Sequence, residues 1–150
     1  MMSELQLKVE TNPSAAVLEQ LQEELHQHNI RESGFDDFLP LAIFVPDEQD
    51  RLIAGLCGCT WGGCCEVDFL WVHPQYRDRG YGRYLMQAVE QEAIRRGCHL
   101  MVLFSYTFQA PDFYQKLGYS ISGIDEDCPR GHRRFHLHKR LHTDREITER

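Results

Sequence analysis

Residues 65–107 limit the folds open to this chain more than any other stretch. They form an apolar strand (65–72), a loop with two glycines (72–82), an amphipathic helix (82–96) and a strand that is apolar almost throughout (99–107). A strand of that composition is typically covered on both faces. Two strands joined through a helix lie parallel, since such crossovers are right-handed. The stretch therefore predicts a β-α-β unit in which helices cover a sheet.

The residues on either side of this unit complete a mixed sheet. Before it, apolar residues at helical spacing predict a helix over 14–28 with Ser14 as its N-cap. Alternating residues predict strands at 5–9, 41–45 and 52–60, and the last two form an antiparallel meander with 65–72. After it, a short helix at 110–117 and strands at 119–124 and 133–139 are expected. The fold class is α/β, in its mixed α+β form.

The 150 residues are enough for one domain, and no linker or repeat divides them. We therefore expect one domain over 1–150, with a tail at 142–150 that is poor in apolar residues and expected to be disordered. No apolar run reaches the ~20 residues of a membrane span, and the N-terminus does not read as a secretory signal. These features predict a cytoplasmic protein without a membrane partner.

Charge and cysteine content exclude two further classes. The net charge of −7 argues against nucleic acid as a partner. Six cysteines are present, but none has the C-x-x-C spacing of a zinc site, so we expect reduced thiols and no metal. The charge is uneven, because residues 1–72 hold 13 acids and 3 bases whereas residues 73–150 hold 10 acids and 13 bases.

The loop at 72–82 carries the most specific motif, Arg77-x-x-Gly80-x-Gly82. Its glycines let the backbone approach a ligand, and the helix that follows offers unpaired N–H groups, an arrangement that suits a pyrophosphate. A Walker loop is excluded because no Gly-Lys-Ser/Thr follows. A dinucleotide fingerprint is excluded because Leu85 stands where the third glycine belongs.

This motif resembles the R/Q-x-x-G-x-G/A motif of the GNAT superfamily of N-acetyltransferases. A second segment, F-Y-Q-K-L-G-Y at 113–119, resembles the F-Y-x-K-x-G-F/Y segment of that family, and the two stand in the family's order, about thirty residues apart. The resemblance covers residues 5–141. It implies the GNAT fold, with an antiparallel N-terminal meander and a parallel pair of strands, 65–72 and 99–107, that splay apart between helices.

The resemblance implies that acetyl-CoA is the cosubstrate and lies where these two strands separate. Its pantetheine arm would pair with backbone groups of Leu70, Trp71 and Val72, and its pyrophosphate would bind the loop. The loop residues expected to bind it are Arg77, Asp78, Arg79, Gly80, Tyr81, Gly82 and Arg83. Many members carry an Asn near the end of the second strand. Here the segment at 107–111 reads T-F-Q-A-P, and Gln109 is expected to replace that Asn.

The acid and base of the reaction are also implied. Tyr114 is the expected general acid for the leaving thiolate. Glu66 lies eleven residues before Arg77, as the base does in histone-acetylating members, and Asp68 is the second candidate. Strand alternation predicts that every second residue here shares one face: Glu66, Asp68, Leu70 and Val72. Solvated carboxylates on a half-exposed strand and an aromatic packing role for Tyr114 remain open alternatives.

The acceptor is the least determined part of the prediction. The acidic first half of the chain favours a cationic primary amine, a small molecule slightly ahead of a protein lysine or N-terminus. We expect direct attack on acetyl-CoA in a ternary complex. The residues expected near the mouth of the acceptor site are Glu32, Asp36, Asp37, Glu66 and Asp68. A non-catalytic acyl-CoA-binding relative is the other alternative, and a homodimer is expected only because dimers are frequent in the family.

Overall fold

The computed structural model describes residues 6–142, and the chain divides into two compact units whose boundary in the sequence lies between Asp36 and Asp37. The first unit contains α1 (Ala15–Ser33), which begins where the Ser14 hydroxyl accepts a hydrogen bond from the Val17 N–H. It ends at Gly34, whose φ of 78° is left-handed and suits glycine. The predicted N-cap is confirmed, and the helix continues past the expected end at His28.

The strand expected at 5–9 is wrong over residues 6–9, which have no regular secondary structure, and Leu5 lies outside the described residues. Alternation of apolar residues is a local signal. A strand also needs a partner for its backbone N–H and C=O groups, and the pattern does not provide one. The tail expected at 142–150 lies outside the described residues except for His142.

The second unit is a six-stranded mixed sheet with the order β1-β2-β3-β4-β6-β5. Its strands are β1 (Leu39–Pro46), β2 (Leu52–Trp61), β3 (Cys64–Val72), β4 (Leu100–Tyr106), β5 (Ser120–Glu126) and β6 (Arg133–Arg140). The β1-β2-β3 meander is antiparallel and β3 runs parallel to β4, so the expected α/β fold is confirmed. Among the described residues, no helix is long and apolar enough to cross a bilayer.

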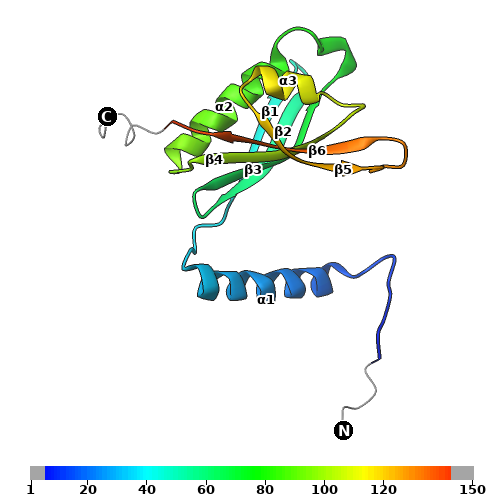
Figure 1. Ribbon diagram of the computed structural model, residues 1–150, viewed down its shortest axis with the longest axis vertical. Helices are drawn as coiled ribbons and strands as arrows, with labels where there is room; N and C mark the ends of the chain where they lie inside the picture. Colours follow the sequence, from blue (N-terminus) through cyan, green and yellow to red (C-terminus); the bar gives the residue numbers. More distant parts are fainter. Residues whose placement is uncertain (1–5, 143–150) are drawn as a thin grey trace. The chain divides into compact units, whose positions relative to one another are not determined.

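The α-helices of this unit are α2 (Tyr81–Arg95) and α3 (Pro111–Lys116), and Figure 1 shows both on one side of the sheet. A short 3₁₀ helix, η1 (Pro74–Tyr76), lies in the loop before α2. Met86, Val89 and Ala93 of α2 are completely buried, as their helical spacing predicts. They share one core with Tyr114 of α3 and with the inward-facing residues of the strands. This core holds the start of α2 and all of α3 beside the same end of the sheet.

The end of α2 is tied to the first two strands through Arg96. Its Nε donates to Glu92 Oε1 at 2.7 Å, the pair that i,i+4 spacing predicts. The Arg96 Nη1 atom donates to the carbonyl oxygens of Leu39 and Pro40 at 3.2 and 3.1 Å and to Thr60 Oγ1 at 3.1 Å. Hydrogen bonds from Arg95 and Arg96 lower the pKa of Glu92 to about 2, so Glu92 remains charged through the physiological range.

A β-bulge in β3 decides how the sheet opens. Gly58 of β2 pairs with Val67, but Cys57 pairs with Phe69, so Asp68 is an extra residue without an opposite partner. The shift turns the strand, because Leu70 pairs with the buried Leu56 and packs against the same core as Val67. The predicted shared face of Glu66, Asp68, Leu70 and Val72 is therefore wrong, since alternation assumes a regular strand.

The bulge also separates β3 from β4. The two strands pair from Cys64 with Leu100 to Val67 with Leu103, and no further pair follows. Past this point β4 continues along β6 to the pair of Tyr106 with Arg134, while β3 stays with β2. The two strands thus splay at Asp68, as the expected fold requires.

We expect Gly58→Ala to weaken the fold. A Cβ at this position would lie 1.9 Å from the Glu66 carbonyl oxygen, so the two strands would have to move apart at the bulge. Such overpacking costs about 1–3 kcal/mol of unfolding free energy, measurable by urea denaturation. Gly123→Ala is the matched control, since its Cβ would meet no atom closer than 3.6 Å. Equal stability of the two variants would show that the close contact at Gly58 does not constrain the strands.

Candidate active site

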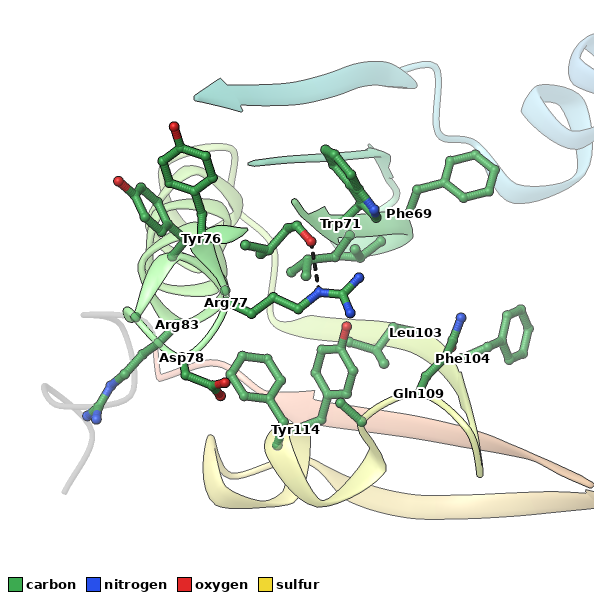
Figure 2. A pocket seen from close by; sticks show the side chains of 18 of the residues that line it. Phe69, Trp71, Tyr76, Arg77, Asp78, Arg83, Leu103, Phe104, Gln109 and Tyr114 are labelled. Atoms are coloured by element: carbon green, nitrogen blue, oxygen red, sulfur yellow. Dashed lines mark hydrogen bonds between the residues drawn. The ribbon is translucent and has the colours of Figure 1, made fainter. Parts of the chain in front are cut away.

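The opening between β3 and β4 forms a cleft of about 820 Å³. Its walls are the residues of β3 from Val67 onward, the loop between Val72 and α2, and the segment from Phe108 to Tyr114. Figure 2 shows side chains of these elements around the cleft, with Arg77 extending into it and Phe69 and Arg83 pointing away from its centre. Because β3 pairs only with β2 beyond Asp68, its other backbone edge faces the cleft and can pair with an extended ligand.

One end of the cleft is the loop that leads into α2. Gly80 is the N-cap of α2 with a φ of 86°, and Asp78 also has a positive φ of 59°. A Cβ on Gly82 would lie 3.3 Å from Phe113 Cζ, so glycine lets the first turn of α2 lie close to α3. Gly80, Tyr81 and Gly82 line the cleft at the N-terminus of a 15-residue helix. This end can therefore bind a phosphate through backbone N–H groups.

The three arginines of this region lie differently. Arg77 projects into the cleft, where its Nε donates to the Val72 carbonyl oxygen at 3.0 Å (Figure 2). Arg83 also lines the cleft. Arg79 is not among the lining residues; its guanidinium lies 5.5 Å from the centre of the Tyr76 ring. Arg77 thus places its guanidinium inside the cleft, and Arg83 adds positive charge at the edge of the cleft (Figure 2).

Tyr114 lies at the wall of the cleft formed by α3, with its ring packed edge-on against Phe113 and Tyr119. Only 9% of the residue is exposed. Burial raises the pKa of Tyr114, because the low-dielectric surroundings penalise the phenolate. Its hydroxyl therefore stays protonated over the physiological range and can donate a hydrogen bond or a proton.

Gln109 lines the cleft at the end of β4, where its side-chain oxygen accepts a hydrogen bond from the Tyr106 N–H at 3.2 Å. The Gln109 N–H in turn donates to the Tyr106 carbonyl oxygen at 2.8 Å. These two bonds fold the 106–109 turn back on the strand. They place the side-chain amide of Gln109 at the wall of the cleft.

The two carboxylates proposed as bases lie in different places. Asp68, at the bulge, lines the cleft. Glu66 precedes the bulge and lines a second, smaller hollow of about 200 Å³ together with residues of β4, β5 and β6. Leu103 and Phe104 belong to the walls of both hollows. The bulge thus separates the two carboxylates, although only one residue lies between them in the sequence.

The structure brings most of the predicted residues to the cleft: Asp68, Leu70, Trp71, Val72, Arg77, Asp78, Gly80, Tyr81, Gly82, Arg83, Gln109 and Tyr114. Glu66 and Arg79 are not at its walls. Sequence reasoning missed the aromatic residues Phe69, Phe104 and Phe113 that also line it. The sequence feature that could have indicated the position of Phe69 is Gly58. Because Gly58 has no side chain, it permits the bulge that turns β3 before Phe69. Asp37, another residue expected near the mouth of the acceptor site, lines neither hollow. Its side chain instead accepts a hydrogen bond from the Gly62 N–H at 2.8 Å.

Comparison with known proteins agrees with this geometry. A model of the Acetyltransferase (GNAT) family matches residues 9–119, so the chain belongs to that family. The family resemblance inferred from the two motifs is confirmed. The protein is an N-acetyltransferase that depends on acetyl-CoA.

Two relatives are similar over much of the chain. Blasticidin-S acetyltransferase of Streptomyces morookaense is 34% identical over 91 residues, which are 60% of this chain and 67% of the relative. The crystal structure of an acetyltransferase from Bacillus cereus is 32% identical, with a TM-score of 0.76, and the match covers 89% of this chain and 98% of that one. An aminoglycoside 6'-N-acetyltransferase complexed with coenzyme A shares the fold at 19% identity, with a TM-score of 0.61 and coverage of 85% and 92%.

Proposed function

We propose that the protein transfers the acetyl group of acetyl-CoA directly to a primary amine, and that the amine is a cationic small molecule. The observation that carries this proposal is the opening of the sheet at Asp68, with a glycine loop at one end of the cleft and Tyr114 at its wall. The cleft-facing backbone edge of Leu70, Trp71 and Val72 would hold the pantetheine arm, with the Val72 carbonyl oxygen at its end already bonded to Arg77. Gln109 would contribute its side-chain amide from the opposite wall.

The anionic end of the cosubstrate suits the loop. Backbone N–H groups of residues 77–82 would bind the pyrophosphate, and Arg77 and Arg83 would add positive charge beside it. The Arg77 guanidinium already donates to the Val72 carbonyl at the mouth of the same backbone edge. Arg79 would act at longer range, because its side chain lies against Tyr76 rather than in the cleft.

The shared wall of the two hollows supports direct transfer. The two hollows adjoin at Leu103 and Phe104, so an amine that enters by the smaller hollow would extend its nitrogen past these side chains to the thioester in the cleft. No cysteine is among the described residues that line either hollow, which disfavours an acyl-cysteine intermediate. In the transfer, the amine nitrogen bonds to the thioester carbon and the carbon–sulfur bond breaks. Tyr114 would donate the proton that the departing sulfur takes up.

The carboxylates favour a cationic acceptor. Asp68 lies at the cleft and Glu66 at the smaller hollow, so each faces a space that the amine has to reach. A negative surface raises the local concentration of cations and speeds their association. One relative is named as a blasticidin-S acetyltransferase, so blasticidin S is the first compound to test. A polyamine, an aminoglycoside and a lysine peptide should be tested alongside it.

Tyr114→Phe tests the acid. The substitution removes only the hydroxyl and keeps the buried ring, so acetyl-CoA affinity measured by calorimetry should not change. Loss of a general acid typically lowers the rate about 10²–10⁴-fold, so kcat should fall by that factor. Tyr84→Phe is the matched control, since it removes the same hydroxyl from an exposed ring of α2 that does not line the cleft and should keep kcat. If the Tyr114→Phe enzyme kept its full kcat, Tyr114 would not be the general acid and its role would be packing alone.

An acceptor screen read out as free coenzyme A tests the substrate class. At saturating acetyl-CoA, kcat/KM for the best amine should fall as salt rises, because the Debye length shrinks from ~10 Å at 0.1 M to ~3 Å at 1 M. Glu66→Gln and Asp68→Asn should each raise KM for that amine. Glu48→Gln, in the turn between β1 and β2, is the control, since it removes the same charge outside both hollows and should leave KM unchanged. A neutral or anionic best acceptor whose kcat/KM ignores salt would rule out the cationic class.

A further inference from the structure

His136, at the wall of the smaller hollow, pairs with Asp125, and the sequence analysis did not predict this pair. Its walls are formed by residues of four strands: Glu66, Val102, Leu103, Phe104, Ser122, His136 and Leu137. His136 is its only imidazole among the described residues. The His136 Nε2 atom lies 2.8 Å from Asp125 Oδ2, across the β5–β6 hairpin. An imidazole at the wall of a hollow, held by a carboxylate from the neighbouring strand, is an arrangement suited to accepting a proton.

Asp125 determines which nitrogen of His136 carries hydrogen. Arg134 Nε also donates to Asp125 Oδ2, at 2.8 Å. Hydrogen bonds from His136 and Arg134 lower the pKa of Asp125, so this group stays a carboxylate and can only accept. The neutral imidazole must then carry its hydrogen on Nε2, and Nδ1 presents a lone pair.

The ring edge that carries Nδ1 lies on the β4 side of His136, next to Phe104, which lines the hollow. A Cβ on Gly123 would lie 3.6 Å from His136 Cδ2, so the Cδ2 edge of the ring faces β5. Nδ1 is on the opposite edge and therefore faces β4, the other neighbour of β6 in the sheet. On that side the Phe104 ring meets the imidazole edge-on, with 4.8 Å between their centres. Phe104 is also the wall shared with the acetyl-CoA cleft.

We propose that His136 Nδ1 takes the proton from the acceptor amine, and that Asp125 is the positioning residue that fixes the imidazole for this role. The proposal rests on the proposed function, because it names the base for the same transfer. As the amine nitrogen forms its bond to the thioester carbon, its N–H proton passes to His136. The carbon–sulfur bond breaks and the sulfur receives a proton from Tyr114. The products are the N-acetyl amine and the free thiol of coenzyme A, and the imidazolium then gives its proton to water while the Tyr114 phenolate takes one back.

The charges around His136 fit this assignment. Asp125 on β5 stabilises the imidazolium that forms, and Glu66 on β3 places a second carboxylate at the same hollow. Arg134 on β6 is bound to Asp125 and lies 5.0 Å from the centre of the Phe104 ring. His138 is on the same strand but pairs with Val102 and is not among the residues of the hollow. In this arrangement Glu66 would bind the ammonium form of the acceptor, which gives one proton to water to become the neutral amine, and His136 would accept the second proton during attack.

Kinetics of four variants test the proposal, with n-butylamine and blasticidin S as amine probes at saturating acetyl-CoA. His136→Gln should lower kcat about 100-fold, the order expected for a lost base, and should change the acidic limb of the pH profile. Asp125→Asn should lower kcat less, and His138→Gln, the matched control, should keep both kcat and the profile. Added imidazole should restore part of the rate of His136→Ala. Equal rates for His136→Gln and His138→Gln, or no rescue, would overturn the proposal.

Nitrogen NMR of the imidazoles gives a readout that does not need turnover. The free protein should show His136 with hydrogen on Nε2, and n-butylamine should shift its Nδ1 signal but not that of His138. Hydrogen on Nδ1 would overturn the assignment even if acetylation is observed. Failure of acetyl-CoA to bind, or of every amine to react, would instead contradict the proposed function, so the two failures are distinguishable.

Discussion

The site depends on one close contact between two backbones. Gly58 lies so near the Glu66 carbonyl that no side chain fits there, and the register of β2 and β3 changes at this point. Because of the extra residue, Asp68, β3 cannot continue beside β4, and the sheet opens instead of closing. The cleft, its free backbone edge and the separation of the two carboxylates all follow from this local irregularity.

The opened sheet gives the two substrates opposite surroundings. The loop end of the cleft combines a helix N-terminus with Arg77 and Arg83, which suits an anionic cosubstrate. The smaller hollow has Glu66 and the His136–Asp125 pair, which suit a cation that must lose a proton. Leu103 and Phe104 separate the two hollows at the end of the paired part of β4. The two hollows therefore adjoin at these residues, and the proposed transfer would take place beside them.

Local patterns predicted the elements well and the irregular positions poorly. The spacing of Leu85, Met86, Val89 and Ala93 gave the buried face of α2, because a helix repeats its environment every 3.6 residues. The bulge could not be predicted, because alternation assumes that each residue has a partner and Asp68 has none. The Asp125–His136 pair depends on the register of the β5–β6 hairpin, which the sequence does not display. The roles of these residues remain proposals.

Hydrogen exchange of backbone amides with and without acetyl-CoA tests the central claim most directly, namely that the opening at Asp68 is the cosubstrate site. Protection on binding should appear in residues 69–72 and 77–82, the free edge of β3 and the phosphate loop. It should be absent from β5, which lies at the far edge of the sheet. Protection confined to β5 and β6, or none in the loop of a protein that binds acetyl-CoA, would contradict the account.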